Sequence, residues 1–106
     1  MNLEKWTIEE ETGYKPITTF WQDFTIAEKY GKDAVKETYK RAFDEWKSNY
    51  KYLTELVLVL NHKLWQHSET NRDLALVYQD LWTEADNYAL DNLKGEEQSY
   101  FLDIID

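Results

Sequence analysis

The segment Tyr50–His67 reads YKYLTELVLVLNHKLWQH, and it decides the fold of this chain. Its main apolar stripe recurs at steps of three, one, three and four residues, which is the spacing of one face of an α-helix. Leu58 and Trp65 form a second apolar stripe, about 120° further round the helix axis. A helix that is apolar on several sides is typical of the centre of a fold, and the alternative is that one stripe contacts another chain. The main stripe consists of Leu53, Leu56, Val57, Leu60 and Leu64.

Three further helices are predicted on either side of this segment, because apolar residues recur there with helical spacing. Gly31 and Gly95 have the residue type that commonly follows the end of a helix. The predicted helices run from about Thr19 to Tyr30, from Asp33 to Ser48 and from Arg72 to Leu93. Their expected N-terminal caps are Thr18 or Thr19, then Asp33, and then Thr70, which with Asp73 forms an approximate capping box.

The two ends of the chain carry apolar residues outside these helices. Residues 1–17 are expected to form an arm, because Gly13 and Pro16 break any helix there, and its apolar residues indicate that part of it packs on the body. The C-terminal residues 96–106 hold five apolar side chains, and we expect them to dock as a short helix. Binding of this tail in a partner's groove is the alternative. The apolar residues of the arm are Trp6, Ile8, Tyr14 and Ile17.

These elements predict an all-α protein. Connections of a few residues favour antiparallel neighbours, so we expect a three- or four-helix antiparallel bundle. The N-terminal arm covers residues 1–17, and a single helical domain with a short C-terminal segment covers residues 18–106.

Composition excludes several classes of function. The chain has 106 residues and no cysteine, which excludes disulfides and zinc–thiolate sites. The apolar run Leu56–Leu60 is far shorter than the roughly 20 residues that cross a bilayer, and the acidic start is no signal peptide, so we expect a cytoplasmic protein. The net charge of −9 disfavours direct binding to nucleic acids or anionic membranes, and it favours basic protein partners.

No catalytic, metal-binding or nucleotide-binding motif is found in the sequence. The residues three positions before His62 and His67 are Val59 and Leu64, which excludes the Glu-x-x-His pairs of di-metal bundles. Three glycines do not build a phosphate-binding loop. We therefore expect no enzyme, no cofactor and no metal. His62 is interpreted as a surface residue, and His67 as a cation that neutralises the C-terminal dipole of its helix.

The remaining signals favour a non-enzymatic protein-interaction or regulatory module that binds a protein partner or a second copy of itself. Leu58 and Trp65 are the predicted apolar contacts. Residues 84–106 hold seven acidic side chains and one lysine, and attraction to lysines elsewhere in the chain is the alternative explanation of this charge. A small-ligand binder with an aromatic pocket between helices and an acidic nucleic-acid mimic are the other functional hypotheses. The acidic residues assigned to charge steering are Glu84, Asp91, Glu96, Glu97 and Asp103.

Two segments resemble known sequences. They are Trp46–Val57 and Asn92–Glu97, the latter followed by Ser99–Phe101. Both are similar to segments of small helical accessory proteins of gut-bacterial genomes and their mobile elements, which have no assigned activity. The likeness covers most of the chain from Thr19 onward and contains no catalytic motif. It implies a bacterial cytoplasmic protein and assigns a role to no residue.

Overall fold

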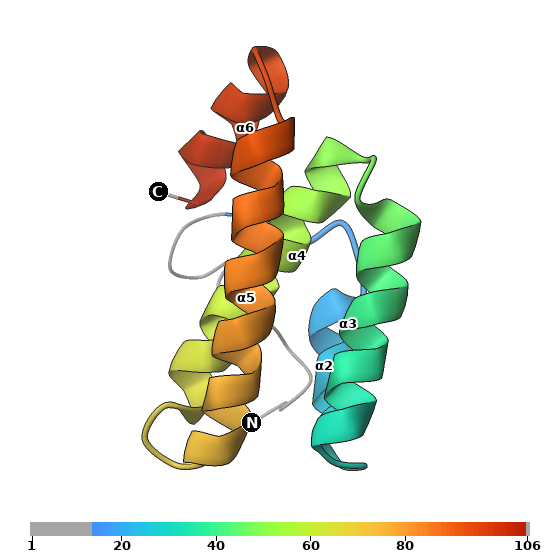
Figure 1. Cartoon of the computed structure of the whole chain (residues 1–106), viewed down its shortest axis with the longest axis vertical. Helices are drawn as coiled ribbons and strands as arrows, with labels where there is room; N and C mark the ends of the chain where they lie inside the picture. Colours follow the sequence, from blue (N-terminus) through green and yellow to red (C-terminus); the bar gives the residue numbers. More distant parts are fainter. Residues whose placement is uncertain (1–13, 106) are drawn as a thin grey trace.

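The computed structural model describes residues 14–105, which form five α-helices joined by short connections. Within these residues there is no strand, so the predicted all-α class is confirmed. Figure 1 shows that α2 to α5 run in alternating directions, with α2 and α3 on one flank of the molecule. None of the described helices combines the length and the apolar character that crossing a membrane requires. The helices are α2 (Phe20–Glu28), α3 (Lys32–Trp46), α4 (Tyr50–His67), α5 (Arg72–Asn92) and α6 (Glu96–Ile105).

Helix α4 is the centre of the fold, as its sequence predicts. It contacts α2, α3, α5 and α6, and every residue from Leu53 to Leu60 is buried. Leu58 is only 5% exposed, because the helices packed round α4 also cover this part of its second stripe. The expectation that Leu58 contacts a partner is therefore wrong. Trp65, about two turns further along the same stripe, is 68% exposed.

The N-cap residues of α3 and α5 differ from those predicted from the sequence, and they are a glycine and an asparagine. Gly31 precedes α3 with a φ of 109°, a conformation that favours glycine, so the expected cap Asp33 lies inside the first turn instead. Asn71 rather than Thr70 caps α5, and its side chain accepts a hydrogen bond from the backbone N–H of Leu74. Asparagine is among the best N-cap residues because its short side chain reaches the unpaired N–H groups of the first turn.

The C-terminal segment docks on its own chain as α6. Phe101 is 1% exposed, and the ring of Tyr100 packs edge-on against Tyr50 of α4 at 5.2 Å between centroids. At the other end of the described chain, Tyr14 packs against the core. The arm residues Trp6 and Ile8 lie outside the described residues.

Candidate functional site

A buried carboxylate fixes the chain just before α2. Glu55, in the middle of α4, has no exposed surface. It accepts hydrogen bonds from the Tyr14 hydroxyl at 2.6 Å, from the backbone N–H groups of Ile17 at 2.7 Å and Thr18 at 2.9 Å, and from the Thr18 hydroxyl. These four donors replace the water that the carboxylate loses on burial. Burial, together with the hydrogen bond and the charge of Glu55, raises the pKa of the Tyr14 hydroxyl above its usual value.

A second polar cluster fixes the other end of α2. Its centre is Oε2 of Glu28, which accepts a hydrogen bond from the Tyr78 hydroxyl at 2.6 Å. The same oxygen lies 3.2 Å from Nζ of Lys63 and 3.0 Å from Nε2 of His67. Lys63 also donates to the Thr25 hydroxyl at 2.7 Å. The cluster therefore connects α2 to α4 and α5.

The surroundings of this cluster shift the pKa values of its members. Burial raises the pKa of the Glu28 carboxyl, but hydrogen bonds from His67 and Tyr78 and the charge of Lys63 outweigh it, so this pKa lies below its usual value. Burial lowers the pKa of the Lys63 ammonium, and Glu28 opposes that change. Lys63 is 1% exposed, and its Nζ lies 4.0 Å from the centroid of the Trp21 ring, which adds a cation–π attraction.

The Glu28 cluster stabilises the fold, because hydrogen bonds and ion pairs join its members to one another. His67 lies in the last turn of α4, the position that the helix-dipole interpretation requires, and it also pairs with Glu28 and stacks on the Tyr78 ring, with 5.8 Å between the ring centroids. His62, expected at the surface, is partly buried. Over residues 14–105, no three His, Asp or Glu side chains gather in a way that would hold a metal ion.

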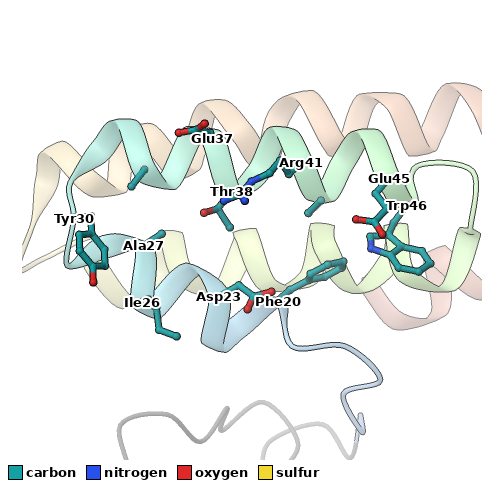
Figure 2. Close-up of a pocket in the computed structure, with 12 residues that line it drawn as sticks. Phe20, Asp23, Ile26, Ala27, Tyr30, Glu37, Thr38, Arg41, Glu45 and Trp46 are labelled. Carbon is teal, nitrogen blue, oxygen red and sulfur yellow. The ribbon is translucent and has the colours of Figure 1, made fainter.

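An open groove of about 530 Å³ lies between α2 and α3. We call its buried and half-buried lining residues the floor and its exposed ones the rim. Three alanines occupy the floor, Ala27 from α2 and Ala34 and Ala42 from α3, and their small side chains leave the space open. Figure 2 shows Phe20 and Trp46 towards one end of the groove.

The rim of the groove combines apolar and charged side chains. Ile26 is 51% exposed, and Tyr30, at the end of the groove near the α2–α3 turn, is 79% exposed (Figure 2). Large apolar side chains exposed beside a hollow are typical of binding surfaces. The charged rim residues are Asp23, Glu37, Arg41 and Glu45.

The site residues predicted from the sequence do not lie at this groove. Trp65 is exposed in the last turn of α4, and the five predicted acidic residues are exposed on α5 and α6. Leu58 is buried, and none of the seven lines the groove. The acidic residues are Glu84 and Asp91 on α5, and Glu96, Glu97 and Asp103 on α6.

Sequence reasoning missed the groove, although the sequence holds a signal for it. Ala34, Thr38 and Ala42 recur at steps of four, which places three small side chains along one face of α3. Ile26 is an apolar residue outside the buried stripe of α2. Small residues on one helix facing an apolar residue on the next indicate a hollow between them, but only if the two helices are known to be neighbours.

Comparison of the chain with protein-family models, with curated proteins and with solved structures finds no match. The function of the groove must therefore be inferred from its own geometry and charge.

Proposed function

We propose that the protein is a non-enzymatic protein-interaction module, and that a segment of a partner protein binds in the α2–α3 groove. The observation that carries this proposal is the groove itself, whose floor of small residues lies beside the exposed side chains of Ile26 and Tyr30. Burying these two side chains against a partner would contribute about 25 cal/mol for each Å² of apolar surface removed from water. The cysteine-free sequence and the resemblance described above support a bacterial cytoplasmic setting.

Both walls of the groove are held in place without a ligand. The polar groups around Glu55 and Glu28 attach the two ends of α2 to α4. Aromatic packing holds α3: the Phe43 ring lies 5.0 Å from that of Tyr88, and the Trp46 ring lies 4.3 Å from that of Tyr52. A preformed groove favours binding, because less conformational freedom is lost when the partner arrives.

The test uses a synthetic amphipathic peptide of about 14 residues, with leucine on one helical face and glutamine on the other. We expect the Leu/Gln peptide to shift the amide NMR signals of groove residues in labelled protein. Ile26→Glu should weaken binding about tenfold, because it places a charge in the apolar contact. Leu76→Glu is the matched control, since Leu76 is 50% exposed on α5 and lies outside the groove. It should leave the Kd within about twofold.

Two results would contradict the proposal. One is a peptide-induced shift that maps to α5 or α6 and leaves the groove residues unchanged. The other is equal weakening by Ile26→Glu and Leu76→Glu, which would mean that the peptide contacts any exposed apolar residue.

A small aromatic ligand is the second candidate, because the groove volume falls in the range of roughly 300–1,000 Å³ that ligand sites occupy. Phe20, Tyr30 and Trp46 supply the aromatic lining. The same NMR titration with 2-naphthol as the probe distinguishes the two functions. Saturable binding of 2-naphthol in the groove that Tyr30→Ala abolishes, together with no peptide binding, would favour the small ligand.

A further inference from the structure

The charge of the rim restricts which partner the groove accepts. Asp23, Glu37 and Glu45 contribute three carboxylates, and Arg41 contributes one positive charge. Among the described residues, none of these four side chains takes part in a salt bridge. The exposed lysines elsewhere on α3 do not line the groove. The rim therefore keeps an excess of negative charge that an approaching basic segment would partly neutralise.

The backbone of the groove restricts the conformation of the partner. Both walls are α-helices, so their N–H and C=O groups are already paired within each helix, apart from the helix ends. An extended peptide would bury its own backbone groups here without partners, which is unfavourable. A helical segment satisfies its backbone internally and presents only side chains to the floor.

The length of the groove sets the length of that helix. The lining residues run from Ala34 to Trp46 along α3, and from Phe20 at the start of α2 to Tyr30 in the turn after it. At about 1.5 Å per residue these spans are about 18 Å and 15 Å. About three turns of a partner helix fill this distance, and three turns carry apolar anchors at positions i, i+3, i+4 and i+7.

We infer that the occupant of the groove is a basic amphipathic α-helix of about three turns, with its apolar face on the floor and its Lys or Arg side chains over the rim carboxylates. This inference rests on the proposed function and adds the chemistry of the partner to it. A second copy of this chain is a poor occupant, because each copy carries a net charge of −9 and the same acidic rim.

The test compares three peptides of about 14 residues that share one leucine face and carry lysine, glutamine or glutamate on the other face. Fluorescence anisotropy at low ionic strength measures the Kd of each peptide for the full chain. We expect the Leu/Lys peptide to bind at least about tenfold more tightly than the Leu/Gln peptide, and the Leu/Glu peptide to bind most weakly. Added salt should reduce these differences.

Charge-reversal variants test whether the rim carboxylates cause the difference in Kd between the peptides. Glu37→Lys/Glu45→Lys should weaken the Leu/Lys peptide about tenfold and strengthen the Leu/Glu peptide. Asp73→Lys/Asp80→Lys on α5 makes the same change in net charge outside the groove, and it should change each Kd by less than about threefold. If circular dichroism shows that the lysine variant of α3 does not fold, Glu37→Gln/Glu45→Gln replaces it, with Asp73→Asn/Asp80→Asn as its control.

The outcomes separate this inference from the function on which it rests. Equal binding of the Leu/Lys and Leu/Gln peptides in the groove would overturn the basic partner and leave the interaction module intact. Equal weakening by the α3 and α5 double variants would assign the effect to net charge and would also overturn the inference. If no peptide shifts the groove signals, both proposals fail.

Discussion

Replacing Glu55 with alanine is expected to lower the free energy of unfolding by about 3–5 kcal/mol. The carboxylate is fully buried and accepts the backbone N–H groups of Ile17 and Thr18 as well as the hydroxyls of Tyr14 and Thr18. Its removal leaves these donors without an acceptor, and each unsatisfied buried donor costs about 1–3 kcal/mol unless water reaches it. Urea unfolding followed by circular dichroism measures the change.

The neighbouring residue Thr54 supplies the control for Glu55→Ala. Thr54 is equally buried, but its hydroxyl donates only to the backbone oxygen of Tyr50 within α4. Thr54→Val is therefore expected to cost about 1 kcal/mol or less. Hydrogen exchange gives a second readout, since the amides of Ile17 and Thr18 should exchange slowly in the native chain and rapidly in Glu55→Ala. A loss below about 1 kcal/mol with unchanged exchange would contradict the anchoring role of Glu55.

Replacing Glu28 with alanine is expected to cost a similar amount, about 3–5 kcal/mol, because it leaves the ammonium group of Lys63 buried without its counter-ion. The Tyr78 hydroxyl and the His67 ring lose the same acceptor. Glu37→Ala provides the control, because Glu37 is exposed on α3 and pairs with none of the described residues, and it should cost less than about 0.5 kcal/mol. Equal effects of the two substitutions would show that the Glu28–Lys63 pair contributes little.

The pH dependence of stability gives an independent check on Glu28. Its pKa in the folded chain lies below the usual value of 4.5, so below pH 4.5 the unfolded chain binds more protons than the folded one. The stabilisation from Glu28 is therefore complete above pH 4.5 and is lost as the pH falls through the folded pKa. Urea unfolding between pH 7 and about pH 3 should show a smaller loss of stability in Glu28→Gln than in the native chain. An equal loss of stability with falling pH in Glu28→Gln and in the native chain would contradict the role assigned to this carboxyl group.

The helices could be predicted from the sequence because the signals for them are local. The apolar stripes fix α4 and α5 to within a residue or two, and Gly31 and Gly95 lie at breaks between helices. The caps were less predictable, since Asn71 lies next to Thr70 and either residue suits the position. What lies beside Leu58 depends on the packing of four other helices on α4, which helical spacing alone does not reveal.

The candidate site could not be predicted from the sequence, because the residues that form it lie far apart along the chain. Glu55 and Lys63 lie within or beside an apolar run, and their partners Thr18 and Glu28 precede them by 37 and 35 positions. No local pattern indicates such pairing. The groove likewise depends on the packing of α2 against α3. The negative charge of its rim does not appear in the net charge of this part of the sequence, because residues 32–63 as a whole carry more basic than acidic side chains.

The attachment of α2 to α4 has a consequence for folding during synthesis. The N-terminal part of the chain leaves the ribosome first, but the Glu55 and Lys63 side chains that hold α2 are translated later. A nine-residue helix is too short to be stable alone in water. We therefore expect α2 to remain unformed on the nascent chain until α4 has emerged, with the α4–α5 hairpin as the template on which the earlier residues fold. Until then, the apolar side chains of α2 are exposed to chaperones and to other nascent chains.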